Sequence, residues 1–321
     1  MNTEAEAAGI WRPVPDATGS QRARAAAERV AGTHATGAEA TGPSWMAANW
    51  EAPAHVHAWV TSRLGGVSHA PFDSFNLATH VGDRIHAVRV NRRLLRDQLP
   101  GIRRLQWLNQ VHGTQVISVM PGQQILRTRT ADAAAVFAPG DGAVVLTADC
   151  LPVFLTDTRG TVAAVAHAGW RGLAAGVLEA TVSALLHARA GSAPTAEGLM
   201  AWFGPAIGPC HFEVGADVRE AFLTAPSAVA TRTALVASGV ATSAAAVAEK
   251  VAAAFLPRAD QPGKWLMDIY ALARLHLQAA GVHRISGGGL CTVCDADHCF
   301  SYRRDGVTGR MASLIYLESR P

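Results

Sequence analysis

The sequence predicts a mixed α/β fold, and two features of the chain lead to that prediction. Apolar strand-like runs alternate with amphipathic helical stretches over most of the 321 residues, which is typical of proteins whose helices cover a sheet. Some strand-like runs also follow one another without a helix between them, as residues 107–119 do before residue 143. Adjoining strands favour a mixed sheet over a purely parallel one.

The composition excludes several classes of protein. The formal net charge is only +3, which is too small for a nucleic-acid binder that depends on phosphate contacts. The N-terminus carries Glu4 and Glu6 without an apolar signal-peptide core, and every long apolar run is interrupted by Gly, Pro or charge. We therefore expect a cytoplasmic protein without membrane contact, whose five cysteines serve metal binding or catalysis rather than disulfides.

The N-terminal part of the chain differs from the rest. Residues 1–44 are rich in Ala, Gly, Thr and Glu and show little apolar periodicity, so we expect a disordered extension. Residues 45–321 are expected to form a single catalytic domain, which the length allows.

The first half of this domain begins with a strand at 56–62, which leads into a loop with two glycines at 61–68. A helix is predicted over 85–99, because apolar residues recur there at helical spacing and Pro100 ends the segment. A strand follows at 114–119. β-Branched and apolar runs then predict short strands at 143–147, 153–156 and 161–166, with Pro152 stopping regular pairing nearby.

The second half alternates helices and strands. An amphipathic helix is predicted over 173–190, and a strand over 199–203 leads into a rigid Gly/Pro loop. Further helices are predicted at 214–225, 244–254 and from 264–268 through residue 278, with a loose segment between the first two. A closing strand is predicted at 311–317.

Two potential ligands lie at the ends of neighbouring central strands. Cys150 follows the run 143–147, and His167 ends the run 161–166, directly before a glycine-rich turn that carries Arg171. Taken singly, each is more often a buried core residue than a functional one. A thiol and an imidazole at adjacent strand ends beside glycines are, however, typical of a cleft site.

His112 adds a third potential ligand from an upstream polar cluster. Two imidazoles and one thiolate suit zinc and leave a fourth position for water or phosphate. The long gaps between His112, Cys150 and His167 argue against a small zinc finger and fit ligands gathered from different strands of a larger fold.

A second set of ligands lies near the C-terminus. Cys291, Cys294, His298 and Cys299 have zinc-site spacing, although free thiols in a surface loop would give the same pattern. Cys210 and His211 are also potential ligands, but adjacent residues in extended structure point opposite ways, so Cys210 is interpreted as structural.

With these residues assembled, the chain resembles the YfiH-type proteins of the laccase-domain, or multicopper polyphenol oxidase, family. The matching motifs run in order from about residue 50 to the C-terminus: TSRLGGVS, NQVHG, DGAVVLTADCLPVFL, AVAHAGWRG, GPAIGPCHFEVG and CTVCDADHCFSYRRDGVTGR. The resemblance implies a four-layer α/β/β/α sandwich and zinc held by His112, Cys150 and His167. Cys294, His298 and Cys299 depart from the family pattern, in which Cys291 stands alone.

The resemblance also implies an activity. Family members are purine nucleoside enzymes that catalyse phosphorolysis of adenosine, inosine, guanosine and methylthioadenosine and deamination of adenosine. Phosphate is then expected at the metal and at Arg63 or Arg171, and the purine N7 at Asp149 or the amides of Asn109 and Gln110. Each of these residues has an alternative explanation, such as capping a turn, filling a loop or forming an ion pair.

Three other functions remain open at this stage. A polyphenol oxidase needs many paired histidines, and only the motif at 55–57 has the H-x-H form, so copper is expected only as an adventitious ion. A cysteine hydrolase would use Cys150 as nucleophile and His167 as base, as in toxins of similar fold that deamidate glutamine. A binding or editing factor for purines or peptidoglycan precursors would bind without turnover. A monomer or weak homodimer is expected.

Overall fold

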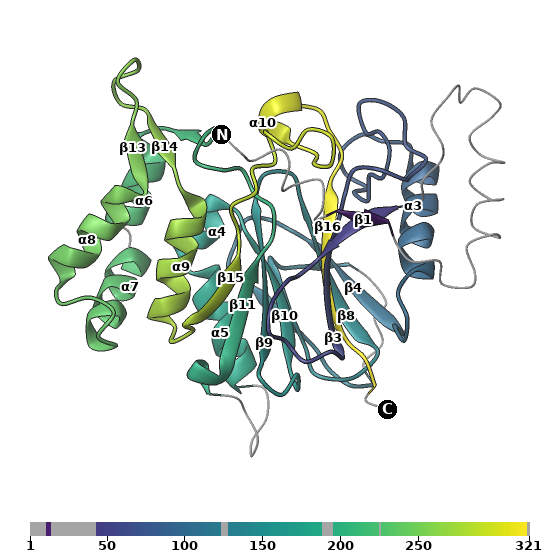
Figure 1. Ribbon diagram of the computed structural model, residues 1–321, viewed down its shortest axis with the longest axis horizontal. Helices are drawn as coiled ribbons and strands as arrows, with labels where there is room; N and C mark the ends of the chain where they lie inside the picture. The colour runs from purple at the N-terminus through teal and green to yellow at the C-terminus, as the bar shows by residue number, and fades with distance from the viewer. Residues whose placement is uncertain (1–10, 14–42, 123–127, 188–194, 225, 320–321) are drawn as a thin grey trace.

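A computed structural model describes residues 11–13, 43–122, 128–187, 195–224 and 226–319. Two mixed sheets pack face to face, and helices cover the outer side of each (Figure 1). The predicted mixed α/β class and its four-layer arrangement are confirmed.

The first sheet contains seven strands in the described part of the chain. β4 runs parallel to β8 and β6, and the other neighbours are antiparallel. The strands, in spatial order, are β1 (Arg12–Pro13), β2 (Ser44–Ala47), β3 (Val56–Thr61), β16 (Met311–Leu317), β8 (Asp141–Thr147), β4 (Arg104–Asn109) and β6 (Arg129–Thr130).

The second sheet contains six described strands. β11 pairs parallel with β15 and β5 pairs parallel with β7, and the remaining pairs are antiparallel. The strands, in spatial order, are β15 (Arg284–Gly287), β11 (Leu199–Phe203), β9 (Leu151–Asp157), β10 (Ala163–Ala168), β7 (Ala133–Val136) and β5 (Val116–Val119).

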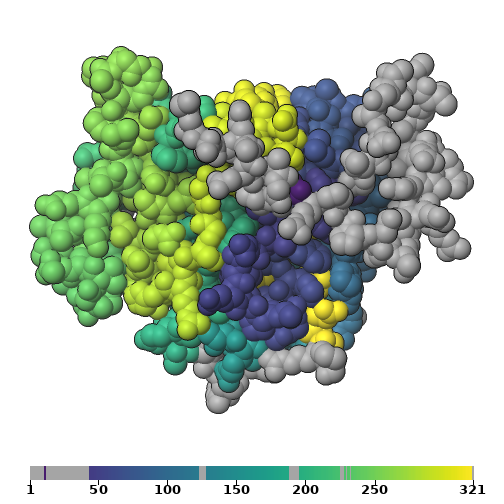
Figure 2. Space-filling view, viewed as in Figure 1, coloured from purple at the N-terminus to yellow at the C-terminus, as the bar shows by residue number. Residues whose placement is uncertain are grey.

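Helices cover the two outer faces unequally. α3 (Ile85–Asp97) lies on the seven-stranded sheet, and α4 (Trp170–Ala175), α5 (Val177–His187) and α9 (Ile269–Ala279) lie on the six-stranded sheet (Figure 1). On that second side, a small sheet of β12 (Glu213–Val214), β14 (Trp265–Met267) and β13 (Phe255–Pro257) accompanies α6 (Ala216–Thr224), α7 (Pro226–Ala237) and α8 (Ala244–Ala253). In Figure 2 the green residues of α7, α8 and the β13–β14 pair gather at one side of the molecule.

The apolar run of β8 is explained by burial on both faces. Ala143 and Val145 pack with Phe154 of β9 in the core between the sheets. Val144 and Leu146 face the opposite way and pack in the core beneath α3. A strand covered on both sides has no need of polar alternation.

Some predicted elements end or change at specific residues. The helix expected over 173–190 is divided at Gly176, whose φ of 99° is left-handed, into α4 and α5. The helix expected to begin at 264–268 starts later, because residues 265–267 form β14. Asp268 then caps α9, with its side chain accepting a hydrogen bond from the Ala271 amide at 3.0 Å.

Other expectations are wrong over short segments. The segment expected to be loose contains α7. Pro152 lies inside β9, opposite His167. β11 pairs with β9 only from Val153 onward, and the Pro152 carbonyl accepts a hydrogen bond from the Gly204 amide, so the strand continues despite the proline.

Residues 11–13, 43 and 44 of the predicted disordered extension are described, and residues 11–13 pack on the domain. β1 pairs with β2, and the buried Trp11 stacks on His298 with ring centroids 5.4 Å apart. The Trp11 indole also donates to Asp295 at 3.0 Å. The rest of residues 1–42 lies outside the described residues.

None of the helices described is both long and apolar enough to cross a membrane.

Candidate active site

The three predicted metal ligands converge where the two sheets meet. His112 lies in the connection from β4 to β5, Cys150 in the connection from β8 to β9, and His167 in β10. Both connections pass from the seven-stranded to the six-stranded sheet. One ligand atom from each residue lies within 4.8 Å of the others, and Cys150 Sγ lies 3.8 Å from His112 Nε2.

The backbone at this junction takes unusual conformations. His112 and Asp149 have φ values of 60° and 91°, a region that non-glycine residues enter at a cost of about 1–3 kcal/mol. Gly169 is required by space, because a Cβ there would lie 2.8 Å from His112 Cδ2 and 3.0 Å from Cys150 Sγ. Gly169 of the AVAHAGWRG motif therefore allows α4 to begin directly beside the potential ligands.

Asp132 holds two of the potential ligands in place, and it was not predicted from the sequence. Its buried carboxylate bonds the His167 Nδ1 at 2.9 Å and accepts hydrogen bonds from the backbone amides of His112 at 2.8 Å and Gly113 at 2.7 Å. With Nδ1 bonded to Asp132, His167 presents Nε2 to the site. Its only sequence signal was an isolated Asp directly before the apolar run 133–136.

Electrostatics favour the ionised form of the Cys150 thiol. Burial alone would raise its pKa, but the charge of His167 and hydrogen bonding by His112 outweigh burial and lower the pKa to about 6. Burial likewise opposes the charge on His167, yet Cys150 and Asp132 raise the pKa of that imidazole to about 9. The thiolate is the form that binds metals and acts as a nucleophile.

The donor set fits a divalent metal such as zinc. Imidazole nitrogens and thiolate sulfurs are the donors of known zinc sites that have three protein ligands. Asp132 supplies the carboxylate–histidine contact that usually orients such a ligand. Three protein ligands also leave a fourth position on the metal for an oxygen donor such as water or phosphate.

A cavity of about 430 Å³ opens over the three ligands. This volume suits a small organic ligand. Part of the wall is apolar and part is cationic. The apolar lining residues are Leu146, Trp170, Ile207, Phe212 and Ile269, and the cationic ones are Arg171, Arg303 and Arg310.

Gln110 and Asp149, the proposed contacts of purine N7, line this cavity, but their polar atoms are engaged by the protein. The Gln110 amide bonds the backbone N–H and C=O of Leu146, both at 2.8 Å. Asp149 accepts from the Thr292 hydroxyl at 2.6 Å and from the Arg303 amide at 2.7 Å. Both side chains therefore fix loops of the cavity wall.

Arg63 and Asn109 are not among the residues that line the cavity. The Arg63 guanidinium bonds Asp73 and the Ala296 carbonyl and lies 5.0 Å from the Phe300 ring centre. The Asn109 amide donates to Thr130 at 3.2 Å. Their positions give no support to a role in phosphate or purine binding.

Arg171 and Arg310 carry the positive charge that faces the cavity. Arg171 lies 4.3 Å from the Trp170 ring centre, and no ion pair is found for it among the described residues. Arg310 donates to the backbone carbonyls of Thr308 and Gly309, and it too has no ion pair in that part of the chain. Burial lowers the pKa of Arg310. The sequence analysis did not single out Arg310.

The predicted second set of ligands is partly wrong. Cys299 is fully buried, and His298 Nδ1 bonds Asp295 at 2.8 Å. Cys291 and Cys294 are instead joined by Cys210 and His211. The latter two residues were expected to point apart, but they lie in a turn rather than in extended structure, with the His211 amide donating to Gly208.

The histidines of the H-x-H motif are engaged elsewhere. His55 Nε2 bonds the Gly160 carbonyl at 2.9 Å, and His57 Nε2 bonds Glu318 at 2.7 Å. Neither belongs to the two groups of potential metal ligands in the described residues.

The chain is similar to known proteins over most of its length. The sequence model of a family described as multi-copper polyphenol oxidoreductase laccase matches residues 57–318. A purine nucleoside phosphorylase from Pseudomonas aeruginosa is 46% identical over 275 residues, 86% of this chain and 99% of that protein. Purine nucleoside phosphorylase YfiH from Escherichia coli is 44% identical over 274 residues, 85% of this chain and 98% of that protein.

Solved structures are similar over nearly the same region. A crystal structure of a Neisseria meningitidis protein matches with a TM-score of 0.72 and 43% identity, covering 86% of this chain and 99% of that one. The crystal structure of YlmD from Geobacillus stearothermophilus matches with a TM-score of 0.70 and 28% identity, covering 88% of this chain and 98% of that one.

Proposed function

This chain belongs to the family described as multi-copper polyphenol oxidoreductase laccase, and we propose that it is a zinc-dependent purine nucleoside phosphorylase. Its relatives named purine nucleoside phosphorylase support an enzyme of this kind. The observation that carries the proposal is that His112, Cys150 and His167 line one cavity together with apolar residues and arginines.

The cavity suits the two substrates of phosphorolysis. A purine is flat and largely apolar on its faces, which matches the wall that contains Ile207, Phe212 and Ile269. Phosphate matches the guanidinium groups of Arg171 and Arg310, which form charge-assisted hydrogen bonds with phosphate oxygens. Arg310 is partly desolvated, so its attraction for an anion is less screened than that of a surface arginine.

The proposed reaction replaces the bond from ribose C1′ to the purine with a bond from C1′ to phosphate. A phosphate oxygen bonds to C1′, the bond from C1′ to purine N9 breaks, and its electron pair leaves with the base. The base takes up the proton that hydrogen phosphate gives up on bonding to C1′, and the products are the free purine and ribose 1-phosphate. Arg171 and Arg310 orient the phosphate for this attack, and the apolar wall excludes water that would otherwise compete. Zinc, when bound, supplies a Lewis acid for an oxygen of the substrates.

The ligand chemistry favours zinc over copper oxidase chemistry. A multicopper site needs several clustered histidines, whereas the cavity group offers two histidines and one cysteine. We therefore propose that copper binds here only as a substitute in vitro, and that residues 45–321 act as one catalytic domain built across both sheets. Adenosine, inosine, guanosine and methylthioadenosine are the proposed substrates, with adenosine deamination as a second reaction.

Chromatography of nucleoside reactions tests this proposal. Adenine from adenosine and hypoxanthine from inosine should appear only with phosphate, each with an equal amount of ribose 1-phosphate. The Cys150→Ala variant, purified identically, controls for contaminating enzymes and should form neither. Absence of free base with phosphate would refute the phosphorylase. Inosine formed from adenosine in either condition would support the deaminase activity, and its absence would remove that activity alone.

One observation favours a second candidate, the cysteine hydrolase. Cys150, His167 and Asp132 form a chain in which a carboxylate orients a histidine beside a thiolate. A thiolate bound to zinc cannot act as the nucleophile. Slow alkylation of Cys150 by iodoacetamide with zinc, and fast alkylation after its removal, would support the zinc enzyme. Equal rates would favour the hydrolase.

A further inference from the structure

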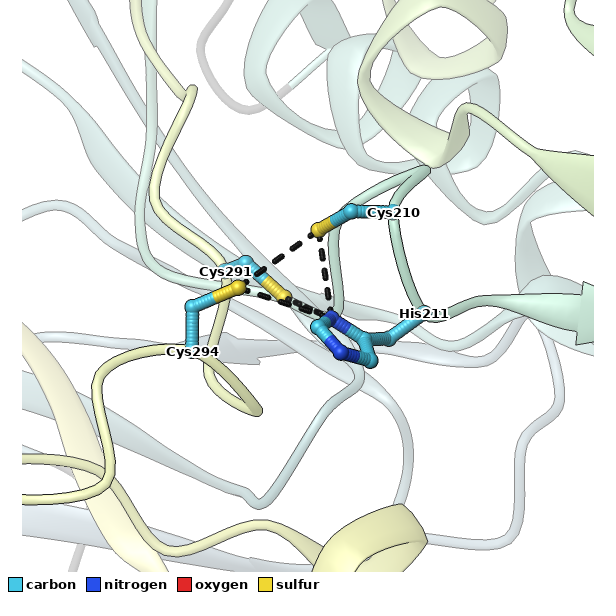
Figure 3. A group of neighbouring side chains, drawn as sticks. All are labelled: Cys210, His211, Cys291 and Cys294. Carbon is cyan, nitrogen blue, oxygen red and sulfur yellow. Dashed lines mark hydrogen bonds between the residues drawn. The ribbon is translucent and has the colours of Figure 1, made fainter. Parts of the chain in front are cut away.

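Four side chains outside the cavity group form a second cluster of potential metal ligands. Cys210 and His211 come from the loop after β11, and Cys291 and Cys294 from the loop after β15, about 80 residues later in the chain. Figure 3 shows His211 Nδ1 directed at the three sulfurs, with Cys291 and Cys294 on one side of the ring and Cys210 on another. All four ligand atoms lie within 4.8 Å of one another.

The distances in this cluster match a tetrahedral zinc site. Bonds of about 2.3 Å to sulfur and about 2.0–2.1 Å to nitrogen place two sulfurs about 3.8 Å apart and a sulfur about 3.6 Å from a nitrogen. Cys210 and Cys294 sulfurs are 3.6 Å apart. His211 Nδ1 lies 3.2 Å from the Cys210 sulfur, 3.6 Å from Cys291 and 3.4 Å from Cys294.

The fold brings the two loops together before any ion binds. β11 and β15 are parallel neighbours, so the loops that follow them leave the same edge of the sheet. The buried Tyr270 hydroxyl accepts from the Ala206 amide and donates to the Leu290 carbonyl, both at 2.7 Å. The Gly208 amide donates to Cys291 Sγ at 3.2 Å, a contact that stabilises a thiolate.

Gly208 also provides the space that the cluster needs. A Cβ at this position would lie 3.0 Å from the Cys291 Cβ and 3.4 Å from the sulfurs of Cys210 and Cys291. Three thiolates this close repel one another, and a divalent cation removes that repulsion.

We propose that Cys210, His211, Cys291 and Cys294 bind a second zinc ion with a structural role. Three thiolates and one imidazole complete a tetrahedral zinc shell, so this site keeps no open position for substrate. Its ligands differ from the C-terminal set that spacing predicts, because His298 and Cys299 are directed elsewhere.

The second zinc ion would stabilise one wall of the active-site cavity. Thr292, next to Cys291, bonds Asp149, and Arg303 donates to the His211 carbonyl at 3.0 Å. Ile207 and Phe212, at the two sides of the first loop, line the cavity. The ion would therefore join the two loops that support these residues.

Metal content of the whole protein tests this proposal. Wild type should contain two zinc ions per chain, and the Cys294→Ser and His211→Ala variants one each. Cys150→Ser should also retain one, and the Cys150→Ser/Cys294→Ser double variant none. His298→Ala is the matched control from the same loop and should keep two. A metal content that Cys294→Ser and His211→Ala leave equal to that of wild type, iron in place of the second ion, or loss of an ion in His298→Ala would overturn the proposal. A single zinc ion in wild type that Cys294→Ser loses and Cys150→Ser keeps would instead overturn only the zinc of the cavity site, on which the proposed function rests.

A measurement on wild type protects the test against variants that fail to fold. Cobalt(II) substitution should give the intense visible and thiolate charge-transfer bands of a tetrahedral Cys₃His centre, in addition to the spectrum of the cavity site. The rival is a Cys210–Cys294 disulfide. Mass spectrometry of protein purified without reductant should find both cysteines free after zinc is removed, whereas a disulfide in most molecules would refute the zinc site.

Discussion

The replacement Asp132→Asn tests how strongly the buried carboxylate organises the cavity site. Asp132 accepts hydrogen bonds from three backbone amides, those of Val111, His112 and Gly113, and bonds His167. Asparagine has one acceptor oxygen, so its amide nitrogen must face donors in either orientation. One orientation leaves the Gly113 and Val111 amides unpaired, and the other disfavours the tautomer that presents Nε2 of His167.

The magnitude follows from these contacts. Val111 is exposed and Gly113 is half-buried, so water can replace part of what their amides lose. At about 0.5–1.5 kcal/mol for each lost hydrogen bond, two reduce the free energy of unfolding by about 1–3 kcal/mol. Losing the carboxylate behind a ligating histidine weakens metal binding by about 10–100-fold. Urea unfolding measures the first quantity, and competition with a chromogenic chelator measures the zinc affinity. Both are measured in a Cys294→Ser background, so that only the cavity site contributes.

Asp157→Asn is the matched control. Asp157 is also buried and accepts from the Thr161 and Val162 amides, but it lies at the end of β9 opposite to Cys150. It should lower stability without changing zinc affinity. Equal zinc affinities for the two variants would refute the positioning role of Asp132.

Three further variants and treatments test other parts of the site. Arg310→Ala should raise the KM for phosphate by about 10-fold or more in steady-state kinetics, while the nucleoside KM changes little. Arg63→Ala, which removes a side chain outside the cavity, should leave the phosphate KM unchanged. Equal effects of the two variants would contradict the assignment of phosphate to Arg310. Gly169→Ala should weaken zinc binding by about 10-fold or more, because the added methyl group would approach Cys150 Sγ to 3.0 Å; unchanged metal content would count against the tight fit. Removal of metal by a chelator should abolish nucleoside turnover, and added zinc should restore it, with the products measured by chromatography. Full activity of the metal-free protein would rule out a zinc enzyme.

Local patterns predicted most of the central elements and the cavity trio. The closing strand was predicted at its observed bounds, and β8 and β3 within two residues, because continuous β-branched runs have few alternatives. The trio was identifiable because Cys150 and His167 each come at the end of an apolar run in the sequence and NQVHG is a polar cluster between apolar segments.

Features that depend on three-dimensional packing were not predictable in this way. Asp132 was missed because a single aspartate before an alanine-rich strand carries no local pattern of its own. The second cluster was assigned to neighbours in sequence, His298 and Cys299, whereas its other two ligands come from the loop after β11. The sheet order brings those loops together, and that order does not appear in spacing.

His112 and Cys150 lie in crossings between the two sheets, whereas His167 lies in β10, so the geometry of the site depends on how the sheets are aligned. A slip of one sheet past the other by a single residue is about 3.3 Å, and a metal site tolerates displacements of only about 0.2 Å. Substitutions deep between the sheets, such as at the stacked rings of Phe154 and Trp202, can therefore alter turnover without touching substrate. In this protein, loss of activity after a remote mutation is as informative about sheet alignment as about the reaction itself.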